Sequence, residues 1–293
     1  MNHKKQAVFK SGKNVVASLL TAGVVLAGTA YAADHYISIN DGAVAADSRG
    51  NYKNDGATGR NSTAIGVDAS AKNQGATAIG AATSATNNAA ISIGTYSNAS
   101  GVSSTAIGQG TLASANAATA IGRQANASGN GSTAIGSASK ASGSAATAFG
   151  SGTSAAGTNS TALGQGAQSS GVYSSAVGTK ANASGLGSSA FGSGSVASGK
   201  YASAYGAGSN ASGDASVAVG LQSKASGKGA VAIGRNAVAS DEYSVALGAN
   251  STTSAPVGTT NATVGGVNYG GFAGTAPVAT VSVGSRGSER TIT

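Results

Sequence analysis

The chain of 293 residues contains no cysteine and no tryptophan, and it has only two prolines and two histidines. Without cysteine there are no disulfide bonds, so stacking and association must stabilise the fold. His3 lies near the start of the chain, and His35 stands alone and is interpreted as a solvated residue. Neither histidine belongs to a cluster that could act as a general base or bind a metal.

Acidic residues are equally scarce, at nine in the whole chain. The adjacent pair Asp241 and Glu242 would point to opposite faces of a strand, so we expect it in a turn and not as an acid–base pair. Serine is abundant, but no base is placed to activate it. We therefore predict no enzyme, no cofactor and no metal site, and the same scarcity of carboxylates disfavours a carbohydrate-processing β-helix.

Residues 1–32 have the pattern of an export signal. A lysine-rich start precedes the apolar or small stretch Val15 to Thr29, and Ala30-Tyr31-Ala32 supplies a small-x-small cleavage site. A transmembrane anchor is the competing interpretation, but the apolar run is shorter than the roughly 20 residues that a span needs. Four of the 17 Lys and Arg residues lie here, so the exported part is only mildly basic, and we predict no nucleic-acid partner.

Glycine makes up 47 residues, and fourteen of them recur at an unbroken interval of 14. Such a fixed period predicts one structural unit stacked on the next. Each of these glycines, position zero of its repeat, follows a large side chain, which in turn follows alanine in every copy except at Ser92. The fourteen glycines are Gly66, Gly80, Gly94, Gly108, Gly122, Gly136, Gly150, Gly164, Gly178, Gly192, Gly206, Gly220, Gly234 and Gly248.

Each repeat predicts two short strands. The alternation Thr133-Ala134-Ile135 before Gly136 indicates the first, and the small residues at positions +3 and +5, with a variable residue between them, indicate the second. A Ser-Gly pair such as Ser142-Gly143 closes most copies, and glycine at these two corners suits turns that need a positive φ. Two strands and two turns in 14 residues predict an all-β parallel β-solenoid, with about 4.8 Å per coil.

The alanine row and the row of large side chains lie on opposite faces of the first strand. Because alanine is almost invariable along the repeats, we expect it inside a thin coil, with the large apolar row pointing outward. An apolar stripe of that extent predicts association into a closed bundle, of two chains or three. The predicted interface is Ile65, Ile79, Ile93, Ile107, Ile121, Ile135, Phe149, Leu163, Val177, Phe191, Tyr205, Val219, Ile233 and Leu247.

The repeat from Ser132 through Gly143 resembles the head repeats of trimeric autotransporter adhesins, the YadA-like family. The lead-in Asn51 to Gly59 resembles the segment that precedes such heads, and the stretches Thr263 to Gly266, Phe272 to Gly274 and Thr280 to Thr293 resemble the start of the neck. The resemblance implies a left-handed β-roll, a side-by-side homotrimer, and display on the outer membrane of a Gram-negative bacterium to bind host surfaces.

These observations divide the chain into a signal peptide (1–32), a lead-in (33–60), a fourteen-coil head (61–254) and a truncated neck (255–293). Family members continue into a coiled-coil stalk and a membrane barrel, whereas this chain ends at Thr293 without heptads or barrel strands. We therefore expect a fragment of a longer adhesin or a truncated product, with membrane attachment only through an anchor outside this chain.

The predicted function is multivalent adhesion to host cells or extracellular-matrix proteins. The candidate ligand-binding residues are the outward polar positions Asn126, Lys140, Asn182 and Lys224. The alternative is an ice-binding solenoid, suggested by a row of threonines from Thr63 to Thr161. That row is one threonine wide, shares the face of the large apolar row and becomes valine by Val217, so lining an interface explains it better.

Overall fold

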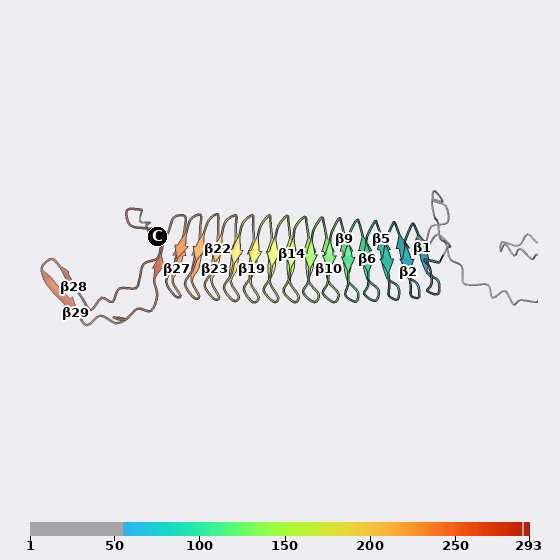
Figure 1. The fold of residues 1–293 in the computed structure, drawn as a ribbon. Helices are drawn as coiled ribbons and strands as arrows, with labels where there is room; N and C mark the ends of the chain where they lie inside the picture. Colours follow the sequence, from blue (N-terminus) through green and yellow to red (C-terminus); the bar gives the residue numbers. More distant parts are fainter. Residues whose placement is uncertain (1–54, 289) are drawn as a thin grey trace, which may run out of the picture. The chain divides into compact units, whose positions relative to one another are not determined.

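The computed structural model describes residues 55–288 and 290–293. The predicted signal peptide and most of the predicted lead-in lie outside these residues. From residue 57 to residue 252 the chain winds as a parallel β-solenoid in which two strands alternate with two turns (Figure 1). In the part of the chain that is described, no helix has the length and apolar character needed to cross a membrane.

The first sheet is formed by the three-residue strand of every coil and is completed by a strand from the C-terminal segment. Its members, in order, are β1 (Thr63–Ile65), β3 (Thr77–Ile79), β5 (Ile91–Ile93), β7 (Thr105–Ile107), β9 (Thr119–Ile121), β11 (Thr133–Ile135), β13 (Thr147–Phe149), β15 (Thr161–Leu163), β17 (Ser175–Val177), β19 (Ser189–Phe191), β21 (Ser203–Tyr205), β23 (Val217–Val219), β25 (Val231–Ile233), β27 (Val245–Leu247) and β30 (Val281–Ser282).

The second sheet is formed by the two-residue strands. Its members are β2 (Ser70–Ala71), β4 (Ser84–Ala85), β6 (Asn98–Ala99), β8 (Leu112–Ala113), β10 (Asn126–Ala127), β12 (Lys140–Ala141), β14 (Ser154–Ala155), β16 (Gln168–Ser169), β18 (Asn182–Ala183), β20 (Val196–Ala197), β22 (Asn210–Ala211), β24 (Lys224–Ala225) and β26 (Val238–Ala239).

Both sheets keep one register along the roll, in which every residue pairs with its counterpart 14 positions away. Ala134 pairs with Ala120 on one side and with Ala148 on the other. The solenoid and its fourteen-residue coil are therefore confirmed. Thirteen coils have both strands, and in the last coil the second strand is reduced to a single bridge between Val238 and Thr252.

The interior of the roll is made of alanine and small hydroxyl residues. Ala134 of the first strand and Ala127 of the second are fully buried, as are their counterparts throughout the roll. The largest fully buried side chains are threonines such as Thr83 and Thr111. The prediction that alanine faces inward is confirmed, and the reason is space, because the two sheets leave no room for a longer side chain.

Each coil consists of two similar halves of seven residues. In the first half the amide of Ala125 donates to the carbonyl of Gly122, and in the second the amide of Ser132 donates to the carbonyl of Gly129. Each half also has one residue with left-handed backbone, such as Gln124 (φ 58°) and, in the second half, Gly131 (φ 63°). The same turn conformation therefore occurs twice in each coil.

Both corner glycines lie close to the backbone of the next coil, but only one of them has a positive φ, which corrects the expectation of a positive φ at both. Gly122, at position zero, has a φ of 124°. Gly129, of the Ser-Gly pair, does not have a positive φ, and a Cβ there would lie 1.9 Å from the carbonyl oxygen of Gly143 in the next coil. The left-handed residue of that corner comes two positions later, and in most coils it is not glycine.

The segment after the last coil returns to the roll. Strands β28 (Asn261–Val264) and β29 (Val267–Gly270) form a separate antiparallel hairpin, and β30 then pairs in parallel with β27. Arg290 donates hydrogen bonds to the carbonyls of Val283 and Ala249 and to the hydroxyl of Ser251. These contacts cover part of the open edge that the last coil would otherwise present.

Candidate binding surface

The large apolar row lies on the outer face of the first sheet, with the threonine and serine row beside it. Along β11 and β9 the pattern is half-buried, buried, half-buried, with the alanine as the buried residue. Phe149 is 50% exposed and Leu247 46%. The rings of Phe191 and Tyr205 stack with centroids 5.1 Å apart and planes 6° apart, and the other members of the row are neighbours in register, as Ile121 and Ile135 are.

The four predicted ligand-binding residues all lie on the outer face of the second sheet. Lys140 and Lys224 are exposed, whereas Asn126 and Asn182 are half-buried. The structure brings Asn126 and Lys140 together as neighbours in register. Asn182 lies three coils beyond Lys140, and Lys224 three coils beyond Asn182. These residues therefore share a row but do not form one cluster, and their role in binding stays a prediction.

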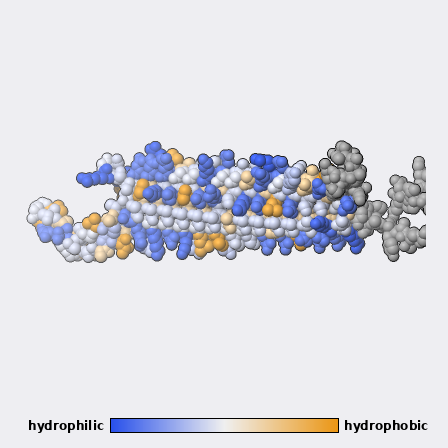
Figure 2. All heavy atoms as spheres, viewed as in Figure 1, coloured by the Kyte–Doolittle hydropathy of each residue, from blue (hydrophilic) through white to orange (hydrophobic). Residues whose placement is uncertain are grey.

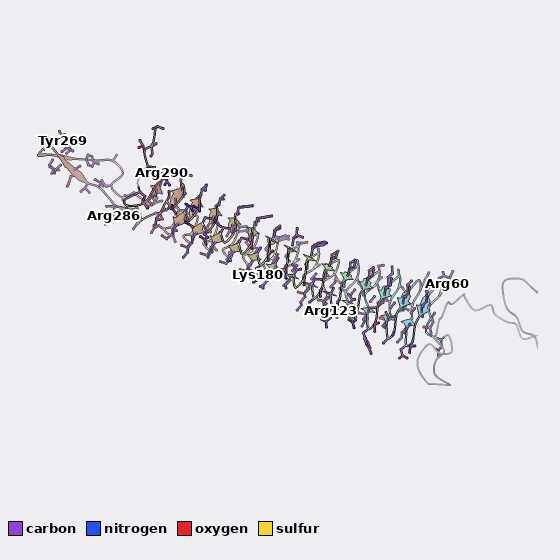
Figure 3. All side chains as sticks on the ribbon, turned by 90° about the horizontal axis from the view of Figure 1, so that it is seen from above. Arg60, Arg123, Lys180, Tyr269, Arg286 and Arg290 are labelled. Carbon is purple, nitrogen blue, oxygen red and sulfur yellow. The ribbon has the colours of Figure 1, made fainter. Side chains whose placement is uncertain are left out.

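In the described part of the chain, the ionisable groups are spread along the roll. Arg60, Arg123 and Lys180 are well separated along the roll in Figure 3. Asp241 and Glu242 lie in a turn, as predicted, and Asp241 accepts a hydrogen bond from the hydroxyl of Thr253. Over residues 55–288 and 290–293, no group of three or more His, Asp or Glu residues could hold a metal ion.

Sequence reasoning missed a row of tyrosines at the second corner of the coil. Tyr173, Tyr201 and Tyr243 all lie nine positions after a repeat glycine, and all are more than half exposed. They occupy the left-handed position of that corner, with φ values of 57° to 59°. Aligning the second seven residues of each coil with the first seven would have identified this as a left-handed position. No single residue type is found there, so the sequence alone did not draw attention to it.

The fold and its surface define the class of protein as a repetitive β-roll. This is a β-roll whose interior is too thin for a ligand and whose outer side chains repeat in rows along its length, as the space-filling view in Figure 2 also shows.

The chain belongs to the YadA head family. The family model described as "YadA head domain repeat (2 copies)" matches seven consecutive segments that together cover most of the roll: 57–83, 85–111, 113–139, 141–167, 169–195, 196–223 and 225–251. The YadA head is a non-enzymatic adhesin domain. The family predicted from the repeat is thus confirmed.

Two solved structures are similar to parts of the chain. The C-terminal YadA-like domain of BPSL2063 from Burkholderia pseudomallei is 55% identical over 24% of this chain and 32% of that chain, with a TM-score of 0.22. The collagen-binding domain of the Yersinia adhesin YadA is 22% identical over 80% of this chain and 73% of that chain, with a TM-score of 0.20. The chain thus spans about a third of the Burkholderia structure. None of the curated proteins matches it.

Proposed function

We propose that the chain is the head of an exported, surface-exposed bacterial adhesin that binds host cells or extracellular-matrix proteins. The observation that carries the proposal is the repetition of outward positions in one register over thirteen complete coils, within a chain of the YadA head family. Each contact made by one coil is available again about 4.8 Å further along. Many weak contacts then add to a useful avidity.

The proposed working form is a homotrimer joined through the large apolar row. Burying one such side chain contributes roughly 1.5–3 kcal/mol, so the row as a whole favours association strongly. The row follows one line along the first sheet, and a closed bundle would cover it on every chain. Attachment to the outer membrane would require an anchor outside this chain.

Adhesion is tested by coating beads with the full chain and measuring their retention on immobilised matrix proteins, including collagen, and on cultured host cells. Beads coated with a scrambled-sequence chain are the control. Retention that increases steeply with coating density supports a multivalent head. Retention no greater than that of the control on every surface would remove the proposal.

A further inference from the structure

The charged side chains of the roll are divided between its two sides. In the nine coils of residues 122–247, the charged residues at positions +1 to +6 are all cations, whereas positions +7 to +13 hold two lysines and three acidic residues. We call the first set the cationic strip: Arg123, Lys140, Lys180, Lys224 and Arg235. All five residues are exposed. One side of the roll is therefore positive, and the other is close to neutral.

The cationic strip follows the first corner of the coil and the outer face of the second sheet. Arg123, Lys180 and Arg235 lie in the first corner, one or two positions after a repeat glycine. Lys140 and Lys224 occupy position +4, in β12 and β24. Arg123 and Arg235 are eight coils apart, which is about 38 Å along the roll. The strip is thus long and narrow, and a ligand that contacts all of it must be extended.

The acidic residues of these coils lie at the second corner, where lysines alternate with them. Position +8 holds Lys200, Asp214, Lys228 and Glu242 in four successive coils. The carboxylate of Asp214 also accepts a hydrogen bond from the backbone amide of Lys200 at 2.9 Å. Neighbouring charges of opposite sign compensate one another there. The cationic strip has no acidic residue among its own positions, so its charge is left for a ligand from outside the chain.

Asparagines between the cations present hydrogen-bond donors on the same face. Asn126 and Asn210 occupy position +4 in β10 and β22 and are half-buried. Their Oδ1 atoms are buried and have no hydrogen-bond partner. The amide nitrogen is therefore the polar side-chain atom that each residue turns to solvent. Guanidinium, ammonium and amide donors together match a ligand that is rich in acceptor oxygens and negatively charged.

An acidic polysaccharide fits this surface better than a nucleic acid or a folded protein does. Duplex DNA carries one charge per about 1.7 Å, which is much denser than the cations of the strip. Single-stranded nucleic acids stack their bases on aromatic side chains, and positions +1, +2 and +4 of these nine coils hold no aromatic residue. The same positions offer no aromatic anchor for a protein interface. In an acidic polysaccharide, the charges are separated by sugar rings whose hydroxyl oxygens can accept hydrogen bonds from amides.

We propose that the cationic strip binds a linear polysaccharide that carries sulfate or carboxylate groups and lies along the roll. The inference rests on the proposed adhesive function and names one class of ligand for it. The lysines and arginines pair with the anionic groups, and the amides of Asn126 and Asn210 donate to oxygens between them. Each exposed contact is weak and is screened by salt, so the affinity depends on several contacts with one polysaccharide chain.

The second-sheet part of the strip stays accessible in the proposed bundle. Lys140 and Lys224 lie on the outer face of the second sheet, across the alanine interior from the first sheet. The large apolar row lies on the outer face of the first sheet. Association through that row therefore leaves the outer face of the second sheet exposed, and a homotrimer would present three such surfaces.

The test measures binding of the full chain to immobilised heparin, a densely sulfated polysaccharide, by biolayer interferometry. We expect the double substitution Lys140→Gln and Lys224→Gln to weaken binding by about fivefold or more at low ionic strength, because two of the five cations are removed. Added salt should weaken binding of the unsubstituted chain as well. Binding that is insensitive to salt would contradict a charge-based contact.

The matched control is the double substitution Lys200→Gln and Lys228→Gln. It removes the same charge from the second corner and should change binding by less than about twofold. Glutamine occurs naturally at both positions of the coil, as Gln168 at position +4 and Gln74 at position +8. Both variants should therefore keep the fold, which circular dichroism checks.

The outcomes separate this inference from the proposed function. Absence of heparin binding, or an equal loss in both double variants, overturns the inference. Tighter binding to duplex DNA or to vesicles containing phosphatidylserine than to heparin overturns it as well. Bead retention on matrix or cells that persists without heparin binding leaves the adhesin proposal standing, whereas loss of retention on every surface removes that proposal itself.

Discussion

The Cβ position of Gly143 lies 2.0 Å from the carbonyl oxygen of Gly157 in the next coil. The same approach recurs from coil to coil along this corner, as between Gly171 and Gly185. With the backbone unchanged, a methyl group added to one of these glycines would meet the next coil, although Asn73, Asn87, Ala115 and Asp241 hold the same position in other coils.

The first prediction compares two glycines at different positions of the second corner, in successive coils. Gly143→Ala should lower the free energy of unfolding by about 1–3 kcal/mol, because its methyl group would lie 2.0 Å from the carbonyl oxygen of Gly157 unless the backbone shifts to the arrangement that accepts Ala115 in another coil. Gly131→Ala should cost only about 1 kcal/mol, since Gly131 has a φ of 63° and nothing lies within 4 Å of its Cβ position. Chemical denaturation measures both, and equal effects would contradict the close-approach argument.

The second prediction concerns the thin interior. Ala162 is fully buried and stacks between Ala148 and Ala176. Ala162→Leu should destabilise the roll by about 1–3 kcal/mol or more through overpacking. Thr161→Leu is the control, because the neighbouring Thr161 is exposed. A thermal midpoint for Ala162→Leu equal to that of the unsubstituted chain would mean that the alanine face is not the interior.

The third prediction concerns the proposed interface. Ile121→Asp should weaken association and leave the coil folded, because Ile121 is on the outer face and its carboxylate replacement can be solvated in a single chain. Light scattering over a dilution series measures the mass, and circular dichroism follows the fold. Gln168→Asp, at an exposed position on the outer face of the second sheet, is the matched control and should leave the mass unchanged. An unfolded Ile121→Asp monomer would show that the assigned faces are inverted.

The fourth prediction concerns buried hydroxyl groups. The Oγ atom of Ser132 is buried without a hydrogen-bond partner, and neighbouring coils have Ala118 and Ala146 at this position. Ser132→Ala should therefore be neutral or stabilising by up to about 1 kcal/mol. Ser104→Ala should instead cost about 1 kcal/mol, because the hydroxyl of Ser104 donates to the carbonyl of Gly101 at 2.7 Å. A larger loss for Ser132→Ala than for Ser104→Ala would contradict this.

Much of the fold could be predicted because each structural position occurs many times along the repeats, so the residue types that it accepts can be seen. One coil with Ala134 and Ile135 does not say which residue is inside, but the near-invariance of alanine over all copies does. The small residues around Asn126 likewise marked the second strand. The fourteen copies therefore provide a comparison between equivalent positions, which a non-repetitive domain does not offer within one sequence.

Other features could not be predicted, for physical reasons. Gly122 combines a positive φ with a close approach to the next coil, whereas Gly129 has the close approach alone, and the residue type does not distinguish the two cases. The row of tyrosines at the second corner was missed because that position accepts glycine, alanine, serine, asparagine and tyrosine alike. The hairpin of β28 and β29 lies between the last coil and β30. It was not predicted because it follows the last repeat, where the sequence has no fixed period from which strands could be inferred.

The constant register has a consequence for how such a molecule can vary in size. Because each coil pairs with the next through equivalent residues, as Ala120 does with Ala134, any coil is a suitable neighbour for almost any other. Insertion or removal of a whole fourteen-residue unit leaves the remaining contacts intact and changes the reach of the roll by about 5 Å. The length of the roll is thus a property that copy number can adjust in small steps, independently of the chemistry that each coil presents.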